Sequence, residues 1–281
     1  MFRSHLPLAV IFLISSLLVK PVQACEVDCV EQHSWAVGVG LGVGEFENPL
    51  FDGKDRNVVV LPSFYYYGEK FYIENTELGY VFVETDDWLF KFKGKFNNDG
   101  LYYNDSIVDD LIVAGAFGPG NFEEPEESVS SGDVDRDLSY MAGIAGDYFV
   151  YDNFKLSVGV YHDVSGVHDG YSISAGSQYV WQQDNWFLAA GIGAEFLDSD
   201  LNQYYYGLRP EDETIYGSFN VGSNSNVIGN FSLSYKINKH FSVIGRYQYK
   251  WLGSQMTVSP LVEDDSTSFF FIGISSQFGS N

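Results

Sequence analysis

The sequence has little positive charge, almost no cysteine and, beyond its first residues, no long apolar run. Its 281 residues include 15 lysines and arginines against 38 aspartates and glutamates, a formal net charge of −23. So negative a chain would be repelled by phosphate, which excludes a nucleic-acid binder built on a basic surface. Only two cysteines are present and no histidines cluster beside them, so no metal site is predicted. A transmembrane helix needs about 20 apolar residues, and no such run follows the N-terminus.

Aromatic residues and glycine are abundant instead. Aromatics make up 17% of the chain, with 20 tyrosines and 23 phenylalanines, and there are 29 glycines. Disordered acidic chains are poor in aromatics, so this chain is expected to fold. Glycine, tyrosine, phenylalanine and valine outweigh the strong helix formers, which argues against a helical bundle. The composition therefore predicts an all-β protein.

The N-terminus has the features of a secretory signal peptide. Arg3 supplies a basic start, residues 6–19 carry no charge, and Ala24 is a small residue at the exit. Residues 1–24 are therefore predicted to be a cleaved signal peptide, because the apolar run is too short for the alternative, a retained anchor helix. Cleavage removes two bases and no acid, which leaves 13 bases against 38 acids.

Cleavage would place Cys25 first, with Cys29 four residues later. In an oxidising compartment the two could form a disulfide, and two free thiols are the alternative. A third interpretation is that Cys25 is lipidated, as in lipoproteins. The residues before Cys25 do not follow the Leu-small-small pattern of a lipoprotein signal, which favours the disulfide or the free thiols.

Most of the remaining chain, 25–281, alternates apolar and polar residues in segments of about ten, separated by turns. Phe241 to Trp251 shows the pattern best, with aromatic or apolar residues on one face and Arg246, Gln248 and Lys250 on the other. Eleven such segments are predicted as strands: 34–45, 57–67, 76–85, 88–98, 138–150, 154–166, 169–181, 185–197, 226–237, 240–252 and 266–278.

Three features favour a transmembrane antiparallel β-barrel over a soluble sandwich. One face of each strand is almost purely apolar over about ten residues, as a tilted membrane strand requires. Short turns alternate with long acidic connections at 99–137, 198–225 and 253–265, which are predicted to be extracellular loops. The strand ends carry tryptophans that would form an aromatic girdle. These are Trp35, Trp88, Trp181, Trp186 and Trp251.

The number of strands follows from parity. Bacterial barrels have an even number of strands, and the turn at Asp86-Asp87 must face the periplasm if the 99–137 connection is to face outside. The segment 70–74 is the only candidate for the missing strand. Twelve strands are therefore predicted, with ten and fourteen as alternatives.

Charge is distributed unevenly over this barrel. The 99–137 connection holds eleven acids and one base. The predicted inward faces hold seven of the mature chain's bases: Lys91, Lys93, Lys95, Lys155, Lys236, Arg246 and Lys250. One interpretation pairs these lumen bases with the inward acids Glu77, Asp147, Asp163 and Glu195, while the loop acids are simply solvated. The alternatives are an anion-attracting lumen and loops that hold divalent cations, for which the acids of 133–137 are the candidates.

Two further features have competing explanations. Gly38, Gly40, Gly42 and Gly44 form an inward row that either relieves crowding in a narrow barrel or receives a plug. The stretch His162 to Gly170 brings histidine, serine and aspartate together, as a hydrolase would need. A Gly-x-Ser-x-Gly elbow is absent, and the stretch falls at a hairpin tip. The chain is therefore predicted to be non-enzymatic and to need no cofactor.

Several segments resemble the MltA-interacting protein/OmpV family of outer membrane proteins. The segments are 35–42, 48–49, 61–62, 66–68, 77–80, 162–166, 168–170 and 204–207. The resemblance implies an outer-membrane barrel surrounded by lipid and lipopolysaccharide. It also implies a scaffold role in murein assembly, with a lytic transglycosylase and a peptidoglycan synthase as partners. A small-solute diffusion channel with a partly basic lumen is the alternative function.

Overall fold

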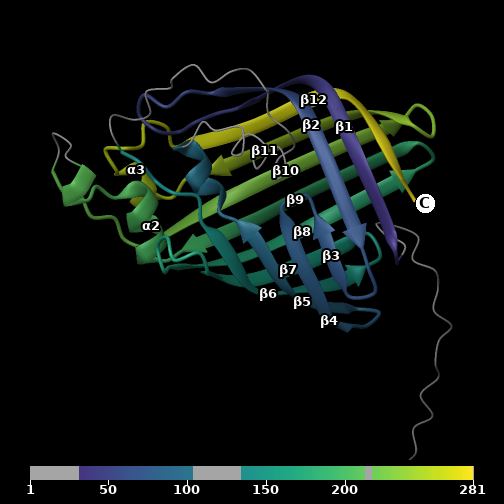
Figure 1. The fold of residues 1–281 in the computed structure, drawn as a ribbon, viewed down its shortest axis with the longest axis horizontal. Helices are drawn as coiled ribbons and strands as arrows, with labels where there is room; N and C mark the ends of the chain where they lie inside the picture. Colours follow the sequence, from purple (N-terminus) through teal and green to yellow (C-terminus); the bar gives the residue numbers. More distant parts are fainter. Residues whose placement is uncertain (1–31, 104–133, 213–216, 281) are drawn as a thin grey trace, which may run out of the picture.

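The protein is a closed antiparallel β-barrel, seen in a computed structural model that describes residues 32–103, 134–212 and 217–280 (Figure 1). Each strand pairs with its neighbours in the chain, and β1 pairs with β12 to close the barrel. The strands are β1 (Ser34–Phe46), β2 (Arg56–Tyr67), β3 (Phe71–Glu74), β4 (Glu77–Glu84), β5 (Trp88–Phe96), β6 (Tyr140–Tyr151), β7 (Phe154–Asp163), β8 (Tyr171–Gln183), β9 (Trp186–Leu197), β10 (Asn224–Lys236), β11 (Phe241–Trp251) and β12 (Ser266–Ser280). The prediction of a twelve-stranded barrel is confirmed, including the short strand at 70–74.

Some predicted features lie outside the described residues. These are the signal peptide at 1–24, Cys25 and Cys29, and part of the two longest acidic connections. Among the described residues, no helix combines the length and the apolar character needed to cross a membrane.

The two ends of the barrel differ in their connections. Tight turns at 152–153 and 184–185 join strands at one end, called here the turn end, where β1 begins and β12 finishes. The long connections leave the opposite end, called here the loop end. They contain η1 (Asn98–Tyr102), α2 (Ser199–Tyr206), η2 (Pro210–Asp212) and α3 (Ser254–Thr257). Figure 1 shows α2 and α3 together at the loop end, far from the C-terminus.

Residues on each strand alternate between the outer surface and the lumen. Val43 and Ile272 are register partners on β1 and β12 and are 63% and 56% exposed. The next partners, Gly44 and Phe271, face inward, and Phe271 is 1% exposed. Because side chains alternate with a period of two, the apolar residues outside form a surface suited to lipid, while polar residues gather inside.

The wall is incomplete beside the loop-end half of β2, because the β3–β4 hairpin is short. Among the described strands, β3 pairs with β2 only at Tyr65–Tyr67. Phe64 exchanges backbone and side-chain hydrogen bonds with Asn75 at the tip of this hairpin. Pro62, two residues before Phe64, directs its backbone toward the same unpaired side, where its missing N–H costs no ladder hydrogen bond. The guanidinium of Arg56 donates to the carbonyl of Leu101 in η1, at 2.6 Å, so η1 lies beside this part of β2.

The described connections fold back into the loop end and close it. We call η1, residues 134–139, α2, η2 and α3 together the cap. Several of its apolar side chains are at most 1% exposed, among them Leu101, Leu201, Tyr206 and Met256. They form one hydrophobic cluster with inward residues of the barrel such as Phe269. In the described part of the chain, the loop end of the lumen is therefore filled with packed side chains.

Candidate functional site

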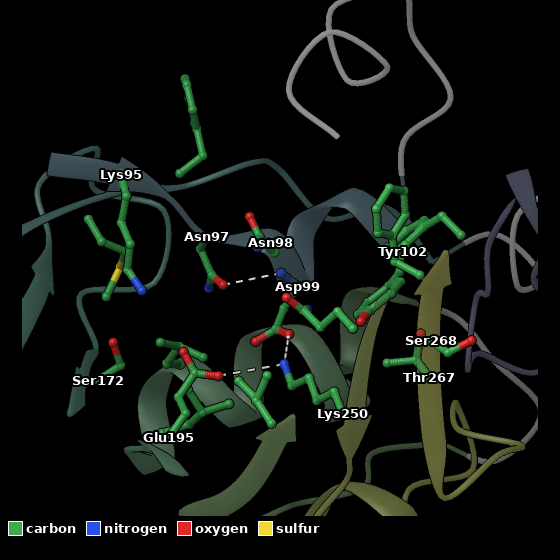
Figure 2. A pocket seen from close by; sticks show the side chains of 18 residues that line it. Lys95, Asn97, Asn98, Asp99, Tyr102, Ser172, Glu195, Lys250, Thr267 and Ser268 are labelled. Atoms are coloured by element: carbon green, nitrogen blue, oxygen red, sulfur yellow. Dashed lines mark hydrogen bonds and ion pairs between the residues drawn. The ribbon is translucent and has the colours of Figure 1, made fainter. Parts of the chain in front are cut away.

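A cavity of about 130 Å³ lies beneath the cap (Figure 2). Its polar lining comes from β5 and the start of η1 on one side, and from β8, β9, β11 and β12 on the other. The lining includes Lys95, Asn97, Asp99, Ser172, Glu195, Gln248, Lys250 and Thr267. The cavity is thus bounded both by the barrel wall and by a connection that the sequence pattern placed outside the barrel.

Lys250 joins the wall to the cap. Its ammonium lies 2.8 Å from Oδ1 of Asp99 and 3.6 Å from Oε2 of Glu195. Lys250 and Asp99 are 7% and 1% exposed, and a charge so buried must be paired to be tolerated. Asn97 sets the position of Asp99, because its side-chain oxygen accepts a hydrogen bond from the Asp99 amide at 3.1 Å.

Two other predicted lumen bases have carboxylate partners on adjacent strands. The Lys91 ammonium lies 2.7 Å from Oδ2 of Asp147, and that of Lys93 lies 2.6 Å from Oε1 of Glu77. Lys95 differs from both, because its ammonium lies over the ring of Tyr161, 4.6 Å from the centroid. The three lysines share one face of β5, as the alternation predicted.

The remaining bases lie at other levels of the barrel. Lys155 lines a second cavity of about 280 Å³, which also touches Lys95 and Glu195. Arg246 faces the lumen from β11, opposite Ser232 and Phe271. Lys236 is the last residue of β10 and is exposed at the turn end. The structure therefore gathers Lys95, Lys155 and Lys250 around two adjoining cavities and leaves Lys236 apart.

The expectation that loop acids are solvated is wrong for Asp99, described above, and for Asp212. Both Nη atoms of Arg136 lie 2.8 Å from the two carboxylate oxygens of Asp212, with side-chain exposures of 0% and 4%. Burial opposes ionisation of Asp212, but the hydrogen bonds from Arg136 hold its pKa below the usual value. Arg136 also donates to the carbonyls of Tyr204 and Gly207. This pair ties residues 134–139 to α2 and η2.

The His162 to Gly170 stretch is a tight connection held by one carboxylate. Asp163 accepts hydrogen bonds from the Ser165 hydroxyl at 2.6 Å and from the amides of Val167 and His168 at 2.7 and 2.8 Å. The Ser165 hydroxyl in turn accepts from the amide of Tyr140. The Ser165 hydroxyl therefore stabilises the turn, with a carboxylate and a backbone amide as its partners. A nucleophilic serine would need a histidine as its partner instead.

A buried serine–histidine contact occurs instead between Ser139 and His168, with 3.0 Å between Oγ and Nε2. The amide of Gly170 donates to Nδ1 of His168 at 2.9 Å, so Nδ1 carries no proton. Burial lowers the pKa of His168, so the ring is neutral near pH 7 and its proton is on Nε2. That tautomer donates to Ser139 and cannot accept the serine proton, which a general base must do.

The five tryptophans lie at strand ends and point outward. Trp35, Trp88 and Trp186 are at or next to the first residue of β1, β5 and β9, and Trp181 is near the end of β8. These four belong to the turn end. Trp251 is the last residue of β11, at the loop end, and is 50% exposed.

The inward glycine row of β1 packs against neighbouring strands. A Cβ on Gly40 would lie 2.9 Å from Cβ of Leu61, and one on Gly42 would overlap the carbonyl oxygen of Ile272. In the described residues, the wall itself crowds these positions. This geometry agrees with the interpretation that the glycines relieve crowding.

Sequence patterns missed Asn97, Asp99, Arg136 and the Ser139–His168 contact. One signal was present for η1: Leu101, Tyr102 and Tyr103 form an apolar group inside an otherwise acidic connection, and all three are buried. Among the described residues, no three histidine, cysteine, aspartate or glutamate side chains gather as a metal site would require.

The closed barrel, its apolar outer surface and its polar lumen define an outer-membrane β-barrel protein. The chain belongs to the family described as MltA-interacting protein MipA, whose family model matches residues 37–278. It is 24% identical over 248 residues to MltA-interacting protein of Escherichia coli K12, covering 85% of this chain and 89% of that protein. It is 23% identical over 243 residues to outer membrane protein OmpV of Vibrio cholerae, covering 86% and 85%. The solved structure of the KdgM porin covers 87% of this chain and 99% of its own, with a TM-score of 0.37 and 12% identity.

Proposed function

We propose that this protein is a non-enzymatic, non-conducting barrel that serves as an outer-membrane platform for murein-assembly proteins. The observation that carries the proposal is the cap: apolar side chains such as Leu201, Tyr206 and Met256 fill the loop end of the described barrel. A diffusion channel needs a continuous aqueous path, and a scaffold does not. The neutral His168 tautomer, which cannot act as a base toward Ser139, supports the absence of hydrolase chemistry.

The partners are taken from the family. Relatives at 24% identity are named MltA-interacting protein, and we infer that this chain likewise contacts a lytic transglycosylase and, through it or beside it, a peptidoglycan synthase. Short turns of bacterial barrels face the periplasm, so the turn end is the surface offered to them. Exposed Asp152 and Lys239 lie in its turns. The loop end then faces lipopolysaccharide.

Site-specific photocrosslinking in intact cells tests the platform. A benzoylphenylalanine at Asp152 or Lys239 is expected to capture a lytic transglycosylase or a peptidoglycan synthase, identified by mass spectrometry. The same group at Asp200, exposed on α2 at the loop end, is the matched control and should capture neither. Absence of both enzyme classes from all turn-end positions, with the barrel present in the membrane, would overturn the scaffold role.

A small-solute channel is the second candidate, and the cavity of about 280 Å³ that Lys95, Lys155 and Glu195 line favours it. Planar-bilayer recordings separate the two functions. The capped barrel is expected to show no stable unitary conductance. A steady conductance whose ion selectivity changes in Arg246→Glu, a lumen position outside the cap, would establish the channel and contradict a sealed barrel.

A further inference from the structure

Two hydrogen-bond donors line the cavity beneath the cap and lack a matching acceptor among the residues that the structure describes. The first is the side-chain amide of Asn97, a residue that is 9% exposed. Its oxygen accepts from the Asp99 amide, which orients the group, and its buried Nδ2 has no hydrogen-bond partner among the described residues. Leaving a buried donor unpaired is unfavourable, so such a group calls for an acceptor.

The second donor is the ammonium of Lys95. Within the described chain, no carboxylate oxygen lies within 4.0 Å of it, whereas Lys91 and Lys93 on the same face of β5 each have one. The ring of Tyr161 covers one side of the ammonium and leaves its other protons to the cavity. Figure 2 shows Lys95 and Asn97 on one side of the cavity and Glu195 and Lys250 across from them.

The donors are two positions apart on an extended segment, so they project from the same face, roughly 7 Å apart at their origins. Asn97 stays extended, with φ −85° and ψ 116°, and its amide continues the pairing through the carbonyl of Ser139. A carboxylate has two acceptor oxygens and can take one hydrogen bond from each donor. The charge of Lys95 makes that interaction stronger than one to a neutral carbonyl.

The opposite wall adds a second requirement. Lys250 is already engaged by Asp99 and Glu195, so it offers no free charge. Glu195 presents a carboxylate that repels a simple anion but accepts a hydrogen bond from a hydroxyl group. We propose that this cavity binds a small hydroxy acid, with its carboxylate between Lys95 and Asn97 and a hydroxyl toward Glu195.

Size and access agree with this class of ligand. The volume of about 130 Å³ admits a molecule of roughly six to ten non-hydrogen atoms. The second cavity shares Lys95 and Glu195 with the first and reaches Lys155, the second residue of β7, near the turn end. The ligand therefore enters from the turn end, and the cap closes the site on the other side.

Methyl NMR of the full barrel in detergent tests the site. Beyond Met1 the chain has two methionines: Met141 lines the cavity, while Met256 is buried in α3. Titration with D-glycerate is expected to shift the ¹³C-methyl signal of Met141 saturably and to leave that of Met256 in place. Propionate, which lacks the hydroxyls, should bind more weakly, and glycerol, which lacks the carboxylate, should cause no shift.

Substitutions then assign the donors. Asn97→Asp keeps the oxygen that holds Asp99 but removes the Nδ2 donor, and Lys95→Gln removes the charge; each is expected to weaken glycerate binding about tenfold or more. Lys93→Gln, on the same face of β5 but outside the cavity, should bind as the wild type does. A Met141 signal unmoved by saturating glycerate, or equal affinity in folded Lys95→Gln, would overturn the proposal.

Discussion

Arg136 and Asp212 form a two-pronged ion pair inside the cap, with both guanidinium Nη atoms 2.8 Å from the carboxylate oxygens and neither side chain open to solvent. The residues come from different connections, 76 positions apart in the chain. The pair therefore links residues 134–139 to the α2–η2 segment by a buried ion pair. The hydrogen bond that Tyr103 donates to the Tyr205 carbonyl links η1 to the same segment.

Breaking this pair should destabilise the cap and spare the barrel wall. Arg136→Met removes the cation that pairs with both oxygens of the buried Asp212 carboxylate and leaves only Arg209, whose guanidinium is 3.5 Å away. The expected cost is about 3 kcal/mol, at the low end for a broken buried ion pair. Faster cleavage of the 199–212 segment by an added protease, with unchanged barrel migration on cold gels, is the expected result. Because the cost comes from a buried charge that has lost its closest partner, the double variant Arg136→Met with Asp212→Leu should be cleaved more slowly than either single variant. If the double variant is the fastest, the pairing argument fails.

The His168 contact should make the cap sensitive to mild acid. Burial lowers the pKa of His168 below its ordinary value of about 6.5. As the pH falls below about 6.5, the unfolded state therefore binds a proton at His168 more readily than the folded state does. The contribution of neutral His168 to folding stability is fully present above about pH 6.5. It is lost as the pH falls toward the pKa of His168 in the folded state. Protonation would also place a hydrogen on Nδ1, where it opposes the donor of Gly170.

Thermal melting followed by near-ultraviolet circular dichroism across the mildly acidic range measures this effect, because tyrosines of the cap provide the signal. The wild type should melt at lower temperature as the pH falls, and His168→Gln should show a flatter profile. Burial raises the pKa of Tyr205, which packs on His168, so Tyr205 does not titrate in this window. His162→Gln is the matched control and should retain the wild-type slope.

Removing the cation beneath the cap is expected to be more damaging than replacing it. Lys250→Met would remove the ammonium that contacts both the buried Asp99 carboxylate and the half-buried Glu195 carboxylate, a loss of about 3–5 kcal/mol. Lys250→Arg keeps the positive charge, so its free energy of unfolding should fall less than that of Lys250→Met. Urea unfolding in detergent, followed through the same near-ultraviolet signal, ranks the variants. Equal stability of Lys250→Met and wild type would show that the Asp99 carboxylate is not held as the distances imply.

The barrel could be predicted from the sequence because each strand repeats one local rule. Alternation with a period of two fixes which residues face lipid, and parity required the four-residue strand β3. The connections that form the cap have no periodic sequence pattern. Asp99 and Lys250 are 151 positions apart, and their contact exists only because η1 turns inward where the acidic composition of the connection suggested an exposed loop. The inward turn of η1 also creates the cavity, so no periodic pattern in the sequence could have revealed Asn97 as a candidate binding residue.

The seam between β1 and β12 offers a test that involves no charge. Gly42 and Gly273 are register partners, and a Cβ on Gly42 would overlap the Ile272 carbonyl oxygen and lie 2.6 Å from the Gly273 Cα. Both obstacles are backbone atoms, so Gly42→Ala must push the closing strands apart, at a cost of about 1–3 kcal/mol. Refolding into detergent, scored by the heat-modifiable gel shift, should give less closed barrel. Among the described residues other than its two chain neighbours, none has an atom within 4 Å of the place that a methyl group on Gly245 of β11 would take. Gly245→Ala should therefore refold as well as the wild type, and matching yields for the two variants would refute steric control of closure at Gly42.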